Sequence, residues 1–401
     1  MTPNHLIVIA NPNSKRWQHF HHDWLAFSAA HPAQPQLTLI PWADWLAAHG
    51  DLSPWLADHP PAYLRLESPG RDQAVVQALW QFAASSPIAE PQASELPTFH
   101  KTEFFQPRRI HAGLERLLTH LTAQLERFPQ IHPLTPPDSI LQMFDKSRHL
   151  NGLRQLRIPV PEMLPIEGRT SHNILTMIRE RHWETAYAKW NFGSSGVGTL
   201  VISPRLSGRI TRTTIHRDAQ GRLHNTRQLE WIDETQTLEL LEVLIAEGLI
   251  VTRGIRPARI DETPFDVRVI LIGGQVTHAQ FRLSHQPLTN LHLGGRRGDR
   301  ARCEAAIPRR AWLDGLAQCQ KAAESLAAHI VGIDLLFEQT SWRPILLECN
   351  AFGDWIPNLL DSQGRSIHRA GLDSLPFARN PDENSTYDPT LGISPRRSNR
   401  L

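Results

Sequence analysis

The 401-residue sequence lacks several features that would assign it to a specialised class. Its three cysteines are too few for the disulfide framework of a small secreted domain. No apolar run approaches the length of a membrane-spanning helix, and no basic-then-apolar leader precedes the first strand-like segment. Lysine and arginine (42) nearly balance aspartate and glutamate (40), so no global charge favours nucleic acid or a membrane surface. We therefore expect a cytoplasmic protein that binds neither.

The sequence also shows no internal repeat and no obvious Ser/His/Asp or Cys/His arrangement. Covalent catalysis by a protein nucleophile is therefore not expected. What the chain offers instead is lysines, arginines, carboxylates and glycine-rich turns.

Residues 1–90 alternate strand-like and helix-like segments, which indicates an open α/β layer with parallel strands. A further helix is expected near His111–Phe128, and the Pro-rich link Pro129–Pro137 sets a boundary after residue 135. The predicted strands are Leu6–Ala10, Gln36–Pro41 and Tyr63–Glu67, and the predicted helices are Trp17–Ala30, Trp42–His49 and Asp72–Ala84.

From residue 136 to about 375 the pattern changes to strands and loops with a few helices, predicted near Asp138–Leu156, Gln236–Glu247 and Arg310–Ala328. Residues 376–401 have little to bury and are expected to be disordered. The sequence thus predicts an N-terminal α/β domain (1–135), a second domain (136–375) and a tail (376–401).

Two short apolar runs near the end of the chain each carry a carboxylate. Gly332–Phe337 contains Asp334, and Ile345–Ala351 contains Glu348 and Asn350. The residues between the runs suit a hairpin loop, and antiparallel pairing would bring the two carboxylates side by side. Two buried negative charges are unfavourable unless a cation lies between them, and such oxygen donors suit Mg²⁺. We predict a magnesium site at these three residues, with partly exposed strand-end acids as the alternative.

A Gly- and Ser-rich stretch follows a lysine near the middle of the chain. One strand ends next to Lys189, and a second resumes at Gly198–Ile202. Glycines let backbone N–H groups turn toward an anion, serine hydroxyls add donors, and the lysine adds a mobile charge. The lysine precedes the glycines, so this is not a Walker loop. The predicted phosphate-binding residues, with a merely flexible turn as the alternative, are Lys189, Gly193, Ser194, Ser195 and Gly196.

Two arginines lie on a predicted hairpin that turns at Gly273-Gly274. Arg268 and Arg282 alternate with apolar neighbours, so both would point toward one pocket or one solvent face. The following loop, Thr289–Gly298, contains Asn290 and further arginines. We interpret it as a second phosphate-facing loop, opposite the first. Taken alone, it reads as a basic loop.

Taken in order, these segments resemble the ATP-grasp superfamily. The loop 289–295 is most similar to that of ribosomal-protein-tail glutamate ligases and of glutathione synthetase-like enzymes. The resemblance covers residues 136 to about 360, and its specificity lies in the number and order of the motifs. These motifs are Asp145-Lys146, Ile158–Pro161, Lys189 with Gly193–Gly198, Asp266–Arg268, Arg282, Asn290–Gly295, Asp334 and Glu348–Asn350.

The resemblance implies an α/β domain followed by an α+β ATP-grasp fold whose two subdomains clamp the nucleotide. It implies ATP and Mg²⁺, or alternatively Mn²⁺, as cofactors. A small-molecule or peptide carboxylate would be activated as an acylphosphate for attack by an amine, with release of ADP and phosphate. Catalytic roles would fall to Arg268, Arg282 and Asn290.

The resemblance also suggests where the nucleotide is held. Lys146 and Lys189 would contact its phosphates. The adenine hinge corresponds to residues 249–255, where Val251, Thr252 and Ile255 are the expected contacts. The sequence departs from the family pattern at three places. Trp190 stands where proline usually follows the lysine, the hinge lacks its usual Gln/Glu-rich motif, and 351–355 replace a small Pro-Gly turn.

Two alternatives to an ordinary ligase remain open from the sequence. One is a non-catalytic nucleotide-binding scaffold on the same fold, although such a protein would be expected to lose metal ligands or phosphate arginines. The other is a ligase that modifies a peptide or protein, because the basic loop 296–302 could grip an acidic chain. The sequence does not identify the acyl donor, the nucleophile or the oligomeric state.

Overall fold

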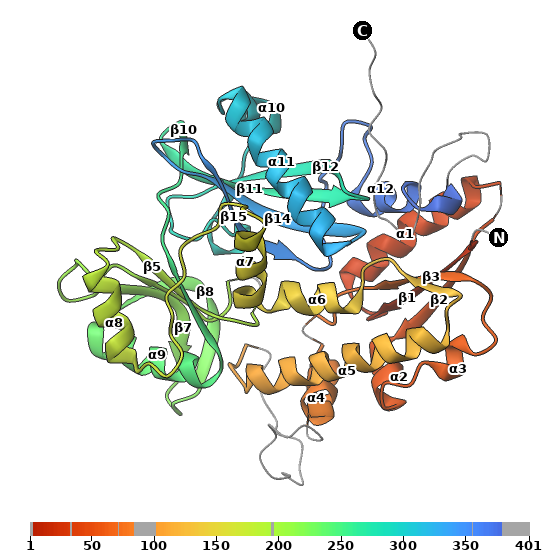
Figure 1. The fold of residues 1–401 in the computed structure, drawn as a ribbon, viewed down its shortest axis with the longest axis horizontal. Helices are drawn as coiled ribbons and strands as arrows, with labels where there is room; N and C mark the ends of the chain where they lie inside the picture. Colours follow the sequence, from red (N-terminus) through yellow and green to blue (C-terminus); the bar gives the residue numbers. More distant parts are fainter. Residues whose placement is uncertain are drawn as a thin grey trace.

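The computed structural model describes residues 3–32, 34–70, 72–83, 102–193, 196–354 and 356–378. Three β-sheets form its framework, each covered by helices (Figure 1). The N-terminal sheet lies on one side of the molecule, and the second and third sheets lie toward the other side, one above the other in this view. No described helix has the length and apolar character needed to cross a membrane.

The first sheet has four parallel strands in the order β2-β1-β3-β4, as the alternating sequence pattern predicts. Helices cover both of its faces, which buries the apolar strand β1 on both sides. The strands are β1 (His5–Ala10), β2 (Gln36–Pro41), β3 (Ala62–Leu66) and β4 (Ile131–Pro133). The helices before β4 are α1 (Lys15–Ala30), α2 (Trp42–Ala47), α3 (Ser53–Leu56), α4 (Gln73–Phe82) and α5 (Pro107–Arg127).

The second sheet is antiparallel, in the order β8-β7-β6-β5-β9, and packs against two helices. Both helices begin with a capping box, at Thr170 and at Asp233, which satisfies their first free N–H groups. The elements are α8 (Ser171–Glu180), β5 (Ala186–Trp190), β6 (Thr199–Ile202), β7 (Thr211–Arg217), β8 (Leu223–Ile232), α9 (Glu234–Ala246) and β9 (Leu249–Arg253).

The third sheet runs in the order β13-β12-β11-β14-β15, with β10 paired to β11. Its pairings are antiparallel. The strands are β10 (Arg259–Ile260), β11 (Thr263–Ile272), β12 (Gln275–Leu283), β13 (Arg296–Arg297), β14 (Ile330–Phe337) and β15 (Pro344–Asn350). The other elements of this part are a 3-10 helix, η2 (Leu291–Leu293), and the helices α10 (Arg300–Ala305) and α11 (Arg309–Leu326).

The helix predicted over 138–156 is two helices, α6 (Pro137–Phe144) and α7 (Lys146–Gln155). The helix is interrupted at Asp145, whose backbone is extended and whose side chain accepts a hydrogen bond from the Arg148 N–H. Aspartate is one of the strongest N-cap residues, so it starts a new helix where the apolar pattern suggested a continuous one. Lys146 is therefore the first residue of a helix.

The chain returns to the N-terminal sheet at its end. Helix α12 (Ile367–Asp373) packs against α1, and Phe377 of the 3-10 helix η3 (Pro376–Ala378) is buried beside them. The rest of the expected disordered tail lies outside the described residues. One apolar core extends from the N-terminal sheet through α5 and α6 to β11, β14 and α11. The division into domains at residue 135 stays a prediction.

Candidate functional site

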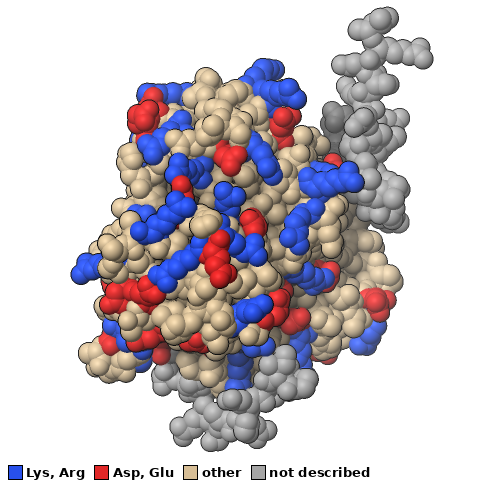
Figure 2. Space-filling view, turned by 60° about the vertical axis from the view of Figure 1, so that its left-hand side comes forward, with Lys and Arg blue, Asp and Glu red and all other residues tan. Residues whose placement is uncertain are grey.

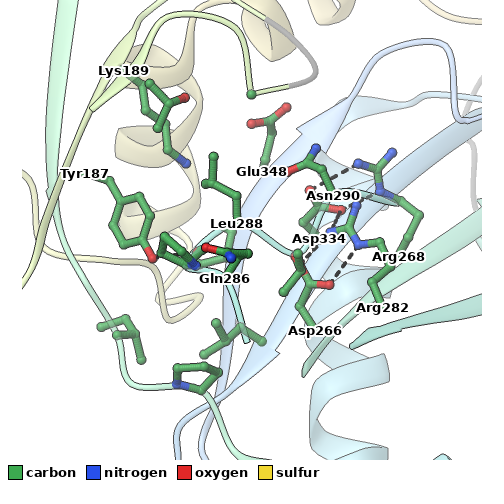
Figure 3. A pocket seen from close by; sticks show the side chains of 18 of the residues that line it. Tyr187, Lys189, Asp266, Arg268, Arg282, Gln286, Leu288, Asn290, Asp334 and Glu348 are labelled. Carbon is green, nitrogen blue, oxygen red and sulfur yellow. Dashed lines mark hydrogen bonds and ion pairs between the residues drawn. The ribbon is translucent and has the colours of Figure 1, made fainter. Parts of the chain in front are cut away.

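A cavity of about 540 Å³ lies between the second and third sheets. Figure 3 shows charged side chains from both sheets pointing into it. Most of the residues predicted from sequence line this single cavity. They are Lys146, Lys189, Gly193, Gly196, Thr252, Ile255, Arg268, Arg282, Asn290, Asp334, Glu348 and Asn350. Ser194 and Ser195 lie outside the described residues.

The acidic strands β14 and β15 pair as predicted. Asp334 lies directly opposite Glu348, and Asn350 lies opposite Gly332. The Asn350 amide nitrogen donates to the Gly332 carbonyl at 3.1 Å, which leaves its side-chain oxygen available to the cavity. Cys349, between these two residues, is buried in the core on the other face. The strand therefore presents oxygen donors on one face, as period-2 alternation requires.

Arg268 and Arg282 share a face because of a β-bulge. Counting back from the Gly273-Gly274 turn would place Asp266 opposite Phe281, but the register shifts by one residue between Ile270 and Leu271. Asp266 therefore pairs with Arg282. A one-residue shift turns every following side chain to the other face of a strand. The bulge thus places both arginines in the cavity.

The two arginines join three carboxylates in one network (Figure 3). Arg282 donates from Nε and Nη2 to both carboxylate oxygens of Asp266, at 2.8 and 2.5 Å. Arg282 Nη2 also lies 3.0 Å from Asp334 Oδ1. Arg268 bonds to Asp334 and, through Nη1, to Asp354 Oδ2 at 2.8 Å. Such planar, permanently charged forks hold carboxylates in a fixed geometry.

Burial and charge oppose each other at Asp334. Burial alone would raise the pKa of this carboxyl, but Arg268 and Arg282 lower it to about 2. The same pairing raises the pKa of Arg282 despite its burial, because Asp266 and Asp334 stabilise the guanidinium. Both groups are therefore charged at any physiological pH. On the wall of the cavity that the third sheet forms (the third-sheet wall), the arginine charges are therefore balanced by neighbouring carboxylates.

The second-sheet wall presents a lysine without such compensation. Lys189 Nζ lies 5.3 Å from the centre of the Tyr187 ring, and no carboxylate lies within ion-pair distance among the described residues. Burial lowers the pKa of this lysine, opposed by the more distant Glu348. A half-buried cation without a carboxylate partner that points into a cavity favours an anionic ligand.

Lys146 is positioned by the start of α7, which docks onto the end of β5. The Asn191 side chain bridges the two elements: its oxygen accepts from the Ser147 N–H at 2.9 Å, and its nitrogen donates to Asp145 at 2.9 Å. Lys146 Nζ donates to the Gly193 carbonyl and lies 3.5 Å from Glu348 Oε2. Lys146 therefore links the glycine-rich loop to the metal-site candidate.

The glycine-rich loop is closely packed where the structure describes it. Gly198 has a φ of +64°, and a Cβ atom there would lie 2.7 Å from the Phe104 ring. On the cavity side, a Cβ at Gly196 would lie 3.7 Å from the Asn290 side-chain oxygen. The two predicted phosphate-facing loops therefore face each other. Tyr187 donates to the Pro287 carbonyl at 2.8 Å, which holds the segment that leads into the second loop.

The hinge strand β9 presents only part of its predicted set to the cavity. Thr252 and Ile255 line it. Val251 does not, because its side chain packs in the core behind the second sheet and its carbonyl accepts from the Leu164 N–H at 2.9 Å. The sequence assignment of Val251 is therefore corrected: alternation turns it away from the cavity.

The donor set suits a hard divalent cation. Among the described residues, no three His, Cys, Asp or Glu side chains are grouped for metal binding. A site here would therefore depend on the Asn350 amide oxygen and on oxygens from a ligand, besides Asp334 and Glu348. Mg²⁺ has this preference, because it usually keeps waters and shares one or two carboxylates with phosphates. The residues present fit Mg²⁺, with Mn²⁺ as the alternative.

Sequence reasoning named Asp266 in a motif without giving it a role, and it gave no role to Asp354. The place of Asp266 in the network could have been found, because it lies two residues from Arg268 and so shares its face. Asp354 follows a turn whose geometry the sequence does not reveal. On the outer surface, Figure 2 shows basic and acidic side chains interspersed over the face in view, in keeping with the balanced composition.

No protein-family model and no curated protein sequence matches this chain. Solved structures match it over nearly their whole length. The macrocyclase MdnC bound with precursor peptide MdnA from Microcystis aeruginosa MRC is similar with a TM-score of 0.53 and 12% identity, over 92% of this chain and 98% of that one. A Chryseobacterium gregarium RiPP-associated ATP-grasp ligase, in complex with ADP and a leader and core peptide, is similar with a TM-score of 0.51 and 12% identity, over 94% of this chain and 96% of that one. The chain has an ATP-grasp fold.

A third match is the D-cycloserine synthetase DcsG, with a TM-score of 0.51 and 14% identity over 92% of this chain and 98% of that one. Two of these proteins are bound to peptides and the third is named for a small molecule, so the ATP-grasp fold alone does not name a substrate. The resemblance found in the sequence is confirmed at the level of the fold. The roles of individual residues rest on the geometry above.

Proposed function

We propose that this protein is an ATP-dependent ligase that joins a carboxylate to an amine. The observation that carries the proposal is the arrangement of charge across one cavity. A half-buried lysine without a carboxylate partner and a glycine-rich loop face an oxygen-donor set of two carboxylates and an amide. A nucleotide triphosphate with its Mg²⁺ carries the complementary charges. The cavity volume, about 540 Å³, falls in the range of about 300–1,000 Å³ usual for small-molecule sites.

In this proposal the nucleotide lies with its adenine against the hinge strand β9 and its phosphates toward the glycine-rich loop. Lys189 and Lys146 neutralise phosphate oxygens from two sides. Asp334, Glu348 and Asn350 would hold Mg²⁺, which supplies charge neutralisation for the transferring phosphoryl group. The low pKa of Asp334 keeps that carboxylate charged for this role.

The reaction has two steps. A carboxylate oxygen of the first substrate attacks the γ-phosphorus, and the bond to the β-phosphate oxygen breaks, which gives an acylphosphate and ADP. The amine then attacks the acyl carbon, the carbon–oxygen bond to phosphate breaks, and phosphate leaves. Phosphoryl transfer of this kind depends on positioning and charge more than on a protein nucleophile.

Arg282 and Arg268 are suited to the charge that develops in the first step. Asp266 and Asp334 engage Arg282 through Nε and Nη2, which leaves Nη1 for the transferring phosphoryl group or the acylphosphate. Arg268 lies beside it and is assigned to the substrate carboxylate or a neighbouring phosphate. Preorganised donors of this kind stabilise a transition state without reorganising at the moment of reaction.

The test is an ADP-release assay with pooled amino acids and acidic peptides, followed by mass spectrometry of the products. Wild-type protein should release ADP and phosphate together with an amide-linked product, and Glu348→Gln should not. Glu338→Gln, in the loop between β14 and β15 and outside the cavity, is the matched control. AMP as the stoichiometric product would overturn the mechanism. Nucleotide binding without turnover on any carboxylate would favour the non-catalytic scaffold.

A further inference from the structure

The second step of the proposed reaction needs a group that receives the amine. In water an alkyl amine is an ammonium ion, and it must lose protons before and after its nitrogen attacks the acyl carbon. A carboxylate at the edge of the cavity can both bind the cation and take up a proton. Among the described residues, five carboxylates line the cavity: Glu184, Asp266, Asp334, Glu348 and Asp354.

Three of the five are already engaged. Glu184 gives both oxygens to the Arg256 guanidinium, each at 2.7 Å, at the hinge end of the cavity. Asp266 is buried and gives both oxygens to Arg282, and Asp334 is held by two arginines. Every oxygen of these three already accepts from an arginine, so the charge of each carboxylate is balanced before an amine arrives.

Glu348 is assigned to the metal site and is contacted by Lys146. That leaves Asp354. Its Oδ2 accepts from Arg268 Nη1 at 2.8 Å, and among the described residues no donor is bonded to its Oδ1. Its side chain is 39% exposed, compared with 15% for Asp334. Asp354 therefore has both a free oxygen and access from solvent.

The turn that carries Asp354 is held in place from both sides. The Gly353 N–H donates to the Asn350 carbonyl at 3.1 Å. Gly353 has a φ of +61°, and a Cβ there would lie 2.5 Å from Ile330, so the backbone fits closely against β14. From the N-terminal unit, Arg16 donates to the carbonyl of Phe352. The position of Asp354 is thus set by backbone contacts.

The same turn lies next to the proposed phosphoryl-transfer site. One guanidinium, that of Arg268, contacts both Asp334 and Asp354. An amine bound at Asp354 would therefore lie about one guanidinium width from the carboxylate that faces the metal.

We propose that Asp354 binds the incoming substrate as a primary ammonium ion and receives the proton released as its nitrogen forms the new bond. The proposal rests on the proposed ligase function. Asp354 first takes one proton from the ammonium ion and passes it to solvent, which gives the nitrogen a lone pair. The carbon–nitrogen bond then forms, the carbon–oxygen bond to phosphate breaks, phosphate leaves with the electron pair, and the second proton passes to Asp354 and then to solvent. The acceptor is accordingly an amine that is cationic in water, rather than an alcohol or a thiol.

The test separates the two half-reactions with hydroxylamine. This nucleophile is largely uncharged at neutral pH and captures an acylphosphate as a hydroxamate, so it needs no ammonium site. The acyl donors are the pooled amino acids and acidic peptides, which also supply the amines. Asp354→Asn should form hydroxamate at a rate within about threefold of wild type. Its rate of amide formation should fall by about a hundredfold or more, in the range of lost general acid–base assistance.

Two further variants complete the design. Asp354→Glu keeps the carboxylate and should recover part of the amide formation. Asp314→Asn, on the exposed surface of α11, is the matched control and should leave both rates unchanged. The melting temperatures of all variants should agree within a few degrees. Replacing His285 or His292, the histidines that line the cavity, should affect amide formation less than Asp354→Asn does.

The outcomes are distinguishable. If Asp354→Asn keeps amide formation, or loses hydroxamate and amide formation equally, the role of Asp354 is wrong while the ligase function stands. If His285→Gln or His292→Gln lowers the rate of amide formation more than Asp354→Asn does, Asp354 is not the group that receives the amine proton. If the wild-type protein binds ATP but forms neither product, the ligase function itself fails, and the proposal for Asp354 fails with it.

Discussion

The two walls of the cavity differ in how their charges are compensated. On the third-sheet wall, Arg268 and Arg282 are tied to Asp266, Asp334 and Asp354 before any ligand is present. On the second-sheet wall, Lys189 is half-buried and has no carboxylate within ion-pair distance among the described residues. The arginine charges of the third-sheet wall are balanced by carboxylates of the same wall. The lysine charge of the second-sheet wall is balanced only when an anion binds.

This difference indicates a division of labour. A wall with internally paired charges keeps its geometry through a catalytic cycle, which suits the groups that must meet a transition state. A wall with an unpaired cation gains free energy when it meets phosphate, which suits binding. We therefore expect substitutions on the third-sheet wall to lower turnover, and those of its paired arginines to lower stability as well. Substitutions of the second-sheet lysine should weaken ATP binding and improve the stability of the free protein.

The largest effect is expected at Glu348. Glu348→Gln should lower the rate constant of turnover by on the order of a thousandfold or more, because several kcal/mol of metal-dependent charge stabilisation would be lost. Folding should be retained, since glutamine is close in shape. Steady-state ADP release and a thermal melt would measure the two properties. Turnover near that of Glu338→Gln would remove Glu348 from the metal site.

The next effect concerns the planar fork of Arg282. Arg282→Lys should lower the catalytic rate constant by about a hundredfold, or about 3 kcal/mol of transition-state stabilisation, while ATP affinity stays nearly unchanged. Because lysine cannot bind both oxygens of Asp266, the melting temperature should also fall. Arg179→Lys, at the exposed pair with Glu234, is the control. A loss of ATP affinity equal to the loss of rate would assign Arg282 to binding.

A smaller effect with opposite signs is expected at Lys189. Lys189→Met should weaken ATP binding by about 1–3 kcal/mol, the range for a lost charge-assisted hydrogen bond. It should also raise the melting temperature of the ligand-free protein, because it removes a partly desolvated charge that has no carboxylate partner. Calorimetry and thermal melts would measure both.

Two lysines serve as comparisons for this result. Lys146→Met should weaken ATP binding similarly without raising the melting temperature, since Lys146 is bonded to Gly193 and lies near Glu348. Lys15→Met, at the exposed start of α1, should change neither property. If Lys189→Met lowers the melting temperature of the free protein, the contrast between the two walls is wrong.

The smallest effect is a pH dependence. Burial lowers the pKa of Lys189 in the folded state below that of the unfolded chain. Between the two values the unfolded chain holds more protons, so the free energy of unfolding should rise as pH increases toward about 10. Urea denaturation from about pH 7 to about pH 10 would show this rise in the wild type. The rise should be smaller in Lys189→Met, and an identical pH profile would contradict it.

The sequence predicted the parts of the site that follow from strand periodicity. Asp334 and Glu348 lie side by side because a hairpin with alternating faces leaves few other registers. The shared face of Arg268 and Arg282 was predicted correctly, yet it depends on a bulge between Ile270 and Leu271 that alternation does not reveal. Counting from the turn alone would have placed the arginines on opposite faces.

Other features depend on contacts between distant segments. Asp145 caps a helix where the apolar pattern continues, and a hydrogen-bonding side chain can override such a pattern. Val251 was assigned to the hinge without a pairing register, which decides the face that each residue presents. Asp354 depends on a turn packed against β14 and on Arg16 from the start of the chain. Local sequence carries no signal for these contacts.

The contact between Arg16 and Phe352 has a consequence for modularity. Arg16 is ion-paired with Glu67, a buried residue at the end of β3, and it donates to a carbonyl whose availability does not depend on the side chain at position 352. The contact would remain with any side chain at position 352, because the acceptor is a backbone carbonyl. It does require an N-terminal unit that contains Arg16 and its ion-pair partner Glu67. A chimera with a different N-terminal unit would have to rebuild the apolar core that this unit shares with β11, β14 and α11, and it would also lose the support beneath Asp354. The N-terminal unit therefore bears on the site through a polar contact as well as through the shared core.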